Sequence, residues 1–331
     1  MRLRGLVLAV AALVLGILTP AARAQLRPDR LYYGVNRAAP MTVEVPAGSA
    51  AGDVTLALLE AGTAKVLHRA PATAGSVDLA ALFPALWKEQ PRKVLYAQLM
   101  LGEQKLGPAV VIQPLLMPSY APRVDGSGTP MFPPDPPGGR PYSGFRAYVD
   151  QNVVLETSKG DITLGLRPDV APNTAWNFRH LVESGFYTDI IFHRIVARLP
   201  TGQPFVVQVG DPTGAGSGGP GYFLDLEPSS LGHGFGVISM ARSGDPNSNG
   251  SQFFICLSRE GTERLDGKYT TFAQTIAGAE VITALAQTPV GPQDRPLEPP
   301  VLKSARLVDA APYGDGPKPV TEPAAPGAPE R

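Results

Sequence analysis

Two β-prone segments constrain the fold of this chain more than any other feature. In residues 191–211, an apolar run ends on Arg194, turns through prolines and a glycine, and returns as a second apolar run that reaches Gln208. In residues 250–256, another β-prone run follows Gln252. Because side chains alternate between the two faces of a strand, these segments would place one fixed cation and one or two amides beside an apolar floor. We therefore expect a groove for a mostly apolar ligand with one carbonyl to hold.

The length and composition favour two mainly β domains. A chain of 331 residues is longer than one typical domain. Its 36 glycines and 36 prolines exceed the usual share and favour strands and turns over a helix bundle. Lysine plus arginine balances aspartate plus glutamate at 29 each, so no overall charge points to nucleic acid or to an anionic membrane.

The N-terminus has the pattern of an export signal. Arg2 and Arg4 precede an apolar stretch, residues 6–18, which is shorter than the roughly 20 residues of a membrane span. An Ala-Arg-Ala triplet then presents small residues where a signal peptidase reads them. We predict that residues 1–24 are a cleaved signal peptide, so that the mature protein is periplasmic or secreted and has no stable membrane insertion. The alternative is an uncleaved anchor.

The rest of the chain divides by composition. Residues 25–113 contain short alternating runs between glycine turns, which predicts a small β-sandwich, immunoglobulin-like in general shape and of unknown role. Residues 114–146 are rich in proline and glycine, have little to bury, and predict a linker. Residues 147–310 combine many strands with two distant helices, which predicts a closed antiparallel barrel. The Pro/Ala-rich residues 311–331 predict a disordered tail.

Several features favour plain structural roles. Cys256 is the only cysteine, so no intramolecular disulfide forms, and its place in an apolar run predicts a small buried side chain. The glycine-rich residues 214–221 lack the Lys-Ser/Thr ending of a phosphate-binding loop and predict a surface loop. No histidine has the spacing of a metal site, and His193 should point away from the face of Arg194 and make a structural hydrogen bond.

Four ordered segments carry a family resemblance: LETSKGDITLGLRPDVAPNTAWNFRHLVESGFYTDIIFHRI, FVVQVGD, GVISMARSGDPNSNGSQFFIC and LDGKYTTFAQ. In these segments the second domain resembles the cyclophilins, a family of peptidyl-prolyl cis-trans isomerases. The resemblance implies an eight-stranded antiparallel barrel with two helices, no cofactor and no metal. It implies that Arg194 is catalytic. It implies substrate-binding roles for Phe205, Val206, Gln208, Ala241, Arg242, Ser243, Gln252, Phe254, Leu265 and Tyr269.

The implied function is peptidyl-prolyl cis-trans isomerisation during the folding of exported proteins. The partners would be unfolded or Pro-containing polypeptides, not nucleic acid. The alternative is a catalytically weak cyclophilin-like module that binds Pro-containing peptides as a chaperone or scaffold. Two departures from the family favour it: residues 197–204 replace a tight turn with a longer connection able to overhang the groove, and Arg264 stands where animal members carry a tryptophan. A third possibility is a structural envelope protein that acts through the sandwich.

Overall fold

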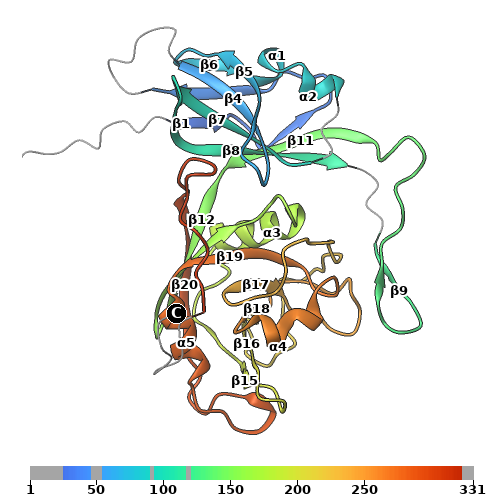
Figure 1. Cartoon of the computed structure of the whole chain (residues 1–331), viewed down its shortest axis with the longest axis vertical. Coiled ribbons are helices and arrows are strands. Elements are labelled where there is room, and N and C mark those ends of the chain that lie inside the picture. The colour runs from blue at the N-terminus through green and yellow to red at the C-terminus, as the bar shows by residue number, and fades with distance from the viewer. Residues whose placement is uncertain (1–24, 46–53, 90–92, 117–120, 323–331) are drawn as a thin grey trace, which may run out of the picture.

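The computed structural model describes residues 25–45, 54–89, 93–116 and 121–322. The predicted signal peptide, residues 1–24, lies outside the described residues. The described chain is mainly β and forms two parts, an N-terminal pair of sheets and a C-terminal barrel, which follow one another along the long axis of the molecule (Figure 1).

The N-terminal part consists of two antiparallel sheets that enclose one hydrophobic core. Leu26 and Met41 of the smaller sheet meet Leu56, Leu99 and Phe145 of the larger sheet, and all five side chains are fully buried. This arrangement confirms the predicted sandwich, whereas its immunoglobulin-like shape stays a prediction. The smaller sheet has the order β1 (Gln25–Pro28), β3 (Pro40–Glu44), β6 (Gly75–Asp78). The larger has the order β2 (Tyr32–Gly34), β11 (Tyr142–Val149), β8 (Gln104–Leu116), β7 (Leu95–Leu101), β4 (Val54–Glu60), β5 (Val66–Pro71).

Two short helices, α1 (Leu79–Leu82) and α2 (Ala85–Lys88), cover one side of this core. The Asp78 carboxylate accepts a hydrogen bond from Ala80 N at 3.0 Å. This bond satisfies one of the free N–H groups at the start of α1. The cap follows from the local sequence, in which an aspartate directly precedes an apolar, helix-prone run.

Strand β11 corrects the predicted domain boundary. It begins at Tyr142, inside residues 114–146, which composition assigned to a linker, yet it pairs with β8 on one side and β2 on the other. The average Pro/Gly content of the segment masked an alternating run in which Phe145 and Ala147 face the core. The N-terminal part therefore extends to Val149, and the barrel begins at Gln151 rather than near residue 147.

Residues 121–141, which precede β11, form an arm beside the barrel (Figure 1). Its tip is a two-stranded hairpin of β9 (Arg123–Val124) and β10 (Pro130–Met131). At its base, the Pro122 carbonyl accepts a hydrogen bond of 2.9 Å from Asn247 Nδ2. The Pro/Gly-rich segment thus contacts the barrel and does not only connect the two parts.

The C-terminal part is one curled antiparallel sheet with few helices. Its order is β14 (Ile190–Ile191), β20 (Val301–Asp309), β12 (Gln151–Thr157), β13 (Gly160–Leu166), β19 (Thr271–Ala277), β17 (Val237–Met240), β18 (Phe253–Cys256), β16 (Pro204–Val209), β15 (Arg194–Arg198). The two main helices are α3 (Pro172–Glu183) and α5 (Ala279–Ala286), and shorter turns are α4 (Arg259–Thr262), η1 (Glu263–Leu265) and η2 (Pro292–Asp294).

The first and last strands of this sheet are neighbours in the chain. Only Phe192 and His193 separate β14 from β15. Phe192 is fully buried, and its N–H donates to the Pro300 carbonyl at 2.8 Å. The two edges of the sheet therefore meet at one broken strand, and counting β14 and β15 together gives the eight strands that the family resemblance implied. Arg194 is the first residue after this break.

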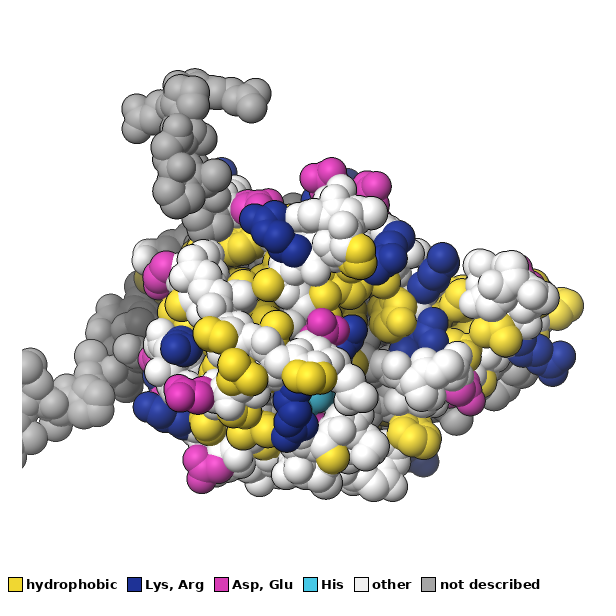
Figure 2. All heavy atoms as spheres, turned by 90° about the horizontal axis from the view of Figure 1, so that it is seen from below, with side chains coloured by type: hydrophobic (Ala, Val, Ile, Leu, Met, Phe, Trp, Pro, Cys, Tyr) yellow, Lys and Arg dark blue, Asp and Glu magenta, His cyan; other side chains and the backbone are white. Residues whose placement is uncertain are grey.

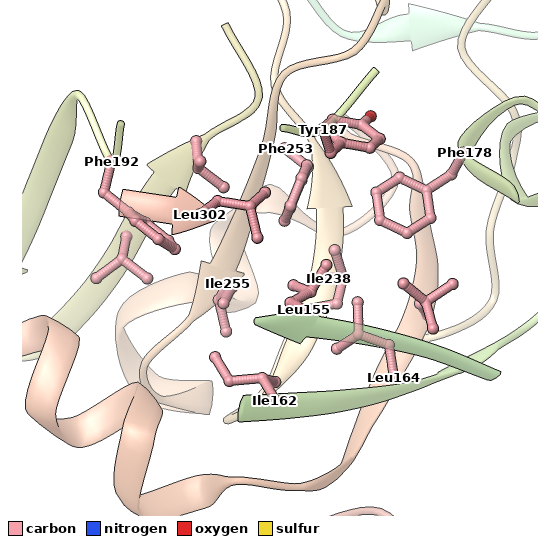
Figure 3. Packing of buried hydrophobic residues seen from close by; sticks show 14 of the residues in the cluster. Leu155, Ile162, Leu164, Phe178, Tyr187, Phe192, Ile238, Phe253, Ile255 and Leu302 are labelled. Atoms are coloured by element: carbon pink, nitrogen blue, oxygen red, sulfur yellow. The ribbon is translucent and has the colours of Figure 1, made fainter. Parts of the chain in front are cut away.

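Aliphatic and aromatic side chains together fill the inside of the barrel (Figure 3). The Phe178 ring of α3 meets the Phe253 ring edge-on, with centroids 5.2 Å apart. Tyr187 packs against both rings and donates its hydroxyl to the Ser251 carbonyl at 2.9 Å. Because Phe253 points inward, Phe254 must point to the outer face of β18.

The two parts share an interface built on α3 and on the chain after β20. The Trp176 ring of α3 packs on the Tyr148 ring of β11, with centroids 4.9 Å apart. The Arg146 guanidinium carbon lies 4.6 Å from the centroid of the Trp176 ring. Gln113 Nε2 also donates to Asn173 Oδ1 at 3.0 Å. One face of the larger sheet therefore lines the core of the sandwich, and the other face packs against the barrel.

Residues 311–322 correct the prediction of a disordered tail. The Tyr313 ring stacks on Tyr96 of the sandwich with centroids 3.5 Å apart, and Lys105 Nζ donates to the Tyr313 carbonyl at 2.6 Å. Further on, Val320 N donates to a carbonyl of β19 in the barrel at 2.9 Å. The prolines of this segment disfavour regular secondary structure, but the Tyr313 ring and these hydrogen bonds hold the segment against both parts. Residues 323–331 lie outside the described residues.

Asp150 is the single residue between β11 of the sandwich and β12 of the barrel. Its negative charge is expected to lower the stability of the fold. Burial, with the nearby Asp169 charge adding to it, raises the pKa of Asp150 to about 7, although a hydrogen bond from Gln151 opposes the rise. A carboxyl whose folded pKa is raised contributes stability while it is protonated, and this contribution is lost as pH rises from about 4 to about 7.

Asp150→Asn should therefore raise the melting temperature by several degrees at pH 8 and leave it unchanged at pH 4, because the amide carries no charge at either pH. Calorimetry of both proteins at the two pH values measures this. An equal gain at both would attribute the effect to packing and contradict the titration.

Among the described residues, no helix is long and apolar enough to cross a bilayer. In the same part of the chain, no group of three or more histidine, cysteine, aspartate or glutamate side chains is placed to hold a metal ion.

Candidate active site

A row of paired residues crosses four strands on the outer face of the barrel. Arg194 of β15 pairs with Gln208 of β16, Gln208 with Phe254 of β18, and Phe254 with Ser239 of β17. Directly opposed residues in an antiparallel sheet point to the same face. The register therefore brings a cation, an amide and an aromatic ring together from segments up to 60 residues apart in the chain.

A second row forms an apolar floor beside the first. Val196, Val206 and Cys256 pair in register across the same strands, and all are buried together with Phe254 in one outer cluster. The exposed fraction of Val206 is 3% and that of Phe254 is 5%. Burial raises the pKa of the Cys256 thiol well above its usual range, which suits a structural side chain and not a nucleophile. The half-buried residues around this floor are Phe205, Leu231, Ala241, Leu265 and Tyr269.

The two predicted amides connect the floor to the glycine-rich loop. Gln208 Nε2 donates to Gln252 Oε1 at 3.0 Å. Gln252 Nε2 donates in turn to the Gly216 and Gly218 carbonyls at 3.1 and 2.9 Å. A cavity of about 610 Å³ opens between these amides, residues 216–223 and residues 241–243. The glycine-rich segment is thus one wall of the site.

The segment Ala241–Ser243 forms the opposite wall. Arg242 Nε donates to the Lys268 carbonyl at 3.0 Å, and its guanidinium carbon lies 4.5 Å from the Tyr269 ring centroid. Ser243 N donates to Ser248 Oγ at 2.9 Å. Asn247, which follows this segment, donates its side-chain N–H to Pro122 at the base of the β9–β10 hairpin. The wall is therefore attached to the barrel on one side and to the arm on the other.

A buried histidine supports the aromatic ring from behind. The His233 ring stacks on Phe254 with centroids 6.0 Å apart. Its Nδ1 lies 2.8 Å from Asp266 Oδ1 and its Nε2 lies 3.0 Å from Ser239 Oγ. Burial lowers the pKa of His233, although Asp266 opposes this. Burial alone would raise the pKa of Asp266, but hydrogen bonds from Arg259 and His233 lower it to about 2.

Among the described residues, His193 does not make the structural hydrogen bond that the sequence predicted. It is buried, but neither ring nitrogen has a hydrogen-bond partner within the described part of the chain. Burial lowers its pKa, with Asp211 opposing the shift and two nearby arginines adding to it. A neutral imidazole is thus favoured beside the cationic Arg194, and the predicted structural hydrogen bond is not present.

The two departures from the family pattern have simple geometries. The connection after Arg198 continues the β15–β16 ladder, because Arg198 pairs with Pro204 and Leu199 N donates to the Gln203 carbonyl at 2.9 Å. Gln203 then contacts Glu260 of α4, and the connection does not line the 610 Å³ cavity. The Arg264 guanidinium carbon lies 4.9 Å from the Phe205 ring centroid, so a cation covers the ring at the rim of the floor.

Figure 2 shows the end of the molecule that carries the β15–β16 hairpin. On this face, the described lysine and arginine side chains lie among hydrophobic, acidic and uncharged groups.

The structure brings all eleven predicted site residues to one outer face of the barrel or its rim. Sequence reasoning missed two groups that contact them: the His233–Asp266 pair behind Phe254, and Asp294, whose Oδ2 lies 3.3 Å from an Arg194 Nη nitrogen. Both pairs are distant in sequence, and neither lies in a recognisable motif. Only the three-dimensional fold could reveal them.

Comparison with known proteins agrees with this fold. The family model for cyclophilin type peptidyl-prolyl cis-trans isomerases matches residues 152–307. Peptidyl-prolyl cis-trans isomerase-like 1 of Gibberella zeae is 41% identical over 163 residues, which is 48% of this chain and 95% of the relative. A putative peptidyl-prolyl cis-trans isomerase of Staphylococcus aureus is 38% identical over 182 residues, covering 46% of this chain and 89% of the relative.

A crystal structure of a Cryptosporidium parvum cyclophilin type isomerase, obtained in the presence of the dipeptide Ala-Pro, is 34% identical and covers 48% of this chain and 99% of that one, with a TM-score of 0.44. Because the chain spans nearly the whole length of relatives that are well over 30% identical, it belongs to the cyclophilin-type peptidyl-prolyl cis-trans isomerase family. The family match covers the barrel, and the sandwich lies outside it.

Proposed function

We propose that this chain is an exported isomerase that accelerates X-Pro isomerisation during the folding of exported proteins. The observation that carries the proposal is the row that sets the Arg194 guanidinium in register with Gln208 and Phe254, beside a buried apolar floor. An unfolded or Pro-containing polypeptide is the substrate class that fits such a groove.

The chemistry needs no nucleophile. Rotation about a peptide bond has a barrier of roughly 18–20 kcal/mol because resonance gives it double-bond character, whereas the two X-Pro isomers differ by only about 0.5–1 kcal/mol. A catalyst must therefore hold the proline ring, exclude water and stabilise the twisted bond, in which the nitrogen lone pair is localised. In our proposal, Phe205, Phe254 and Leu265 hold the ring.

Arg194 stabilises the twisted bond in this scheme. A guanidinium is charged at any working pH and has several N–H donors in a planar arrangement. One N–H can donate toward the prolyl nitrogen as its lone pair localises, or hold the adjacent carbonyl. Both interactions are stronger beside an apolar wall than in water. Gln208, Gln252 and the backbone of Ala241–Ser243 would hold the peptide on either side.

A protease-coupled peptide assay tests the proposal. The full-length mature chain should accelerate cis-to-trans conversion of an X-Pro peptide in proportion to its concentration. A second Pro-containing peptide that the protease does not cleave should compete for the groove and slow the conversion. Binding of the peptide without any acceleration would replace the proposal with the alternative, a module that binds Pro-containing segments without turnover.

Export rests on the N-terminal pattern alone. Arg2 and Arg4, the short apolar stretch and the Ala-Arg-Ala triplet predict cleavage after Ala24. N-terminal sequencing of protein recovered from the periplasm or medium should therefore begin at Gln25. Full-length protein that begins at Met1 and stays with the cytoplasm would contradict export without affecting the isomerase proposal.

A further inference from the structure

One carboxylate contacts the proposed catalytic arginine. Asp294 Oδ2 lies 3.3 Å from an Nη nitrogen of Arg194, across 100 residues of sequence. Within the described residues, this is the one hydrogen bond that the Arg194 side chain makes to protein. The two side chains are 43% and 42% exposed, so a substrate can reach the guanidinium while the contact persists.

The backbone that presents this carboxylate is unusual. Gln293 and Asp294 have φ angles of 60° and 59°, which places two consecutive residues with side chains in the left-handed region that glycine prefers. Such conformations persist only where the surrounding structure enforces them, and they gather at functional sites. The backbone strain therefore indicates a functional role for the loop.

The surrounding structure does enforce the loop. Gly291 N donates to the Arg295 carbonyl at 2.8 Å, and Leu297 N donates to the Pro289 carbonyl at 3.0 Å. Arg295 Nη1 donates to the Gly214 carbonyl at 2.9 Å, which attaches the loop to the glycine-rich wall of the site. Asp294 is thus held from both sides, next to Arg194 and continuous with the cavity wall.

We propose that Asp294 is a positioning residue for Arg194. An arginine side chain has many rotamers and loses entropy when it is fixed. A carboxylate held by a strained but well-anchored loop accepts one N–H and restricts the guanidinium before the substrate arrives. The guanidinium has five N–H donors, so the others stay available to the peptide. This inference rests on the proposed function, because it assumes that Arg194 acts on the X-Pro bond.

Asp294→Asn is the most informative variant. Asparagine accepts the left-handed conformation almost as readily as aspartate, so the loop is kept while the charge is removed. An exposed ion pair has a modest effect, so we expect kcat/KM to fall by about two- to fivefold. The loss should be reproduced by Asp294→Gly, which tolerates the same φ without strain and covers the possibility that the first variant folds poorly.

Two further readouts separate positioning from a general structural effect. The kcat/KM of the unmodified chain should fall as NaCl rises from about 0.05 to about 1 M, because salt screens the exposed pair, and Asp294→Asn should lose that dependence. In NMR spectra, the guanidinium signals of Arg194 should show restricted rotation in the unmodified chain and free rotation in Asp294→Gly, which has no side-chain acceptor. Asp189→Asn is the matched control, since Asp189 is an exposed aspartate with a φ of 55° whose backbone N–H bonds to Lys303.

The outcomes are distinguishable. If the unmodified chain is inactive, the proposed function fails, and the inference fails with it. If the chain is active and depends on Arg194 but Asp294→Asn matches it in rate, salt response and guanidinium rotation, positioning by Asp294 is overturned alone. A variant that is faster than the unmodified chain would also overturn it, because Asp294 would then compete with the substrate.

Discussion

Arg194→Ala is expected to lower kcat/KM for X-Pro isomerisation by about 100-fold, with little change in the melting temperature. Removing one preorganised donor to a developing charge costs about 10²–10³-fold in enzymes that depend on it, and 100-fold corresponds to about 2.7 kcal/mol. The side chain is 43% exposed and bonds within the described chain only to Asp294, so the fold does not depend on it. The protease-coupled assay and a thermal melt of the same sample measure both quantities.

Two substitutions on the same strand serve as controls. Arg198→Ala removes an exposed arginine four residues away that bonds only to the Gly202 carbonyl at 2.7 Å within the described chain, and it should keep the full rate. Arg194→Lys keeps the charge but loses the planar set of donors, and it should recover only a small part of the activity. Full activity in Arg194→Lys would show that charge alone is sufficient and would contradict the donor mechanism. Full activity in Arg194→Ala would remove Arg194 from the reaction.

Phe253 and Phe254 are expected to separate stability from activity. Phe253 is fully buried inside the barrel against Phe178 and Tyr187, so Phe253→Ala should cost about 3–5 kcal/mol of unfolding free energy. Phe254 lies on the outer face beside Tyr269 and His233. A void there opens toward the groove and can take up water, so Phe254→Ala should cost less stability. It should lower kcat/KM by about tenfold, equivalent to about 1.4 kcal/mol of lost contact with the proline ring.

Denaturant unfolding and the peptide assay, run on both variants, measure this contrast. Because the two residues are adjacent and have the same side chain, they are matched controls for each other. The prediction requires the larger loss of stability in Phe253→Ala and the larger loss of activity per folded molecule in Phe254→Ala. The reverse order would mean that the inner and outer faces of β18 are assigned incorrectly, and the floor of the groove with them.

The sequence predicted the barrel well because apolar and polar residues alternate along its strands. This alternation indicates which side chains point into the barrel and which point outward. Ile195, Val207 and Ile255 face the core. Their neighbours Arg194, Gln208 and Phe254 face outward, and this alternation is visible in the printed sequence. The family resemblance then selected which outward residues belong together. The pairing of distant strands, by contrast, is not visible in alternation and came from the resemblance.

The errors have two physical causes, and the first is composition averaged over a long window. The proline and glycine content of residues 114–141 set the predicted boundary of the linker, and it concealed β11, which pairs with β8 in the sandwich. In the C-terminal tail, one aromatic side chain outweighs its Pro/Ala-rich surroundings, because Tyr313 stacks on Tyr96. Short ordered elements of this kind are diluted in any average over their neighbours.

The second cause is backbone conformation that no periodicity encodes. The left-handed pair Gln293 and Asp294 lies in a loop without alternation or a helical repeat. Its contact with Arg194 joins residues 100 positions apart, and the contact of His233 with Asp266 spans 33. Long-range side-chain contacts between loops depend on the closed barrel, so they could be found only after the strands were assembled.

Exchange NMR of a proline peptide at equilibrium tests most directly whether the groove around Arg194 catalyses rotation about an X-Pro bond. Uncatalysed isomers exchange over tens of seconds, so exchange cross-peaks between cis and trans signals are absent on the timescale of about a second. We predict that a catalytic amount of the mature chain makes these cross-peaks appear, and that an equal amount of Arg194→Ala does not. Cross-peaks that stay absent with the unmodified chain, although the peptide binds, would show that the groove does not catalyse this rotation.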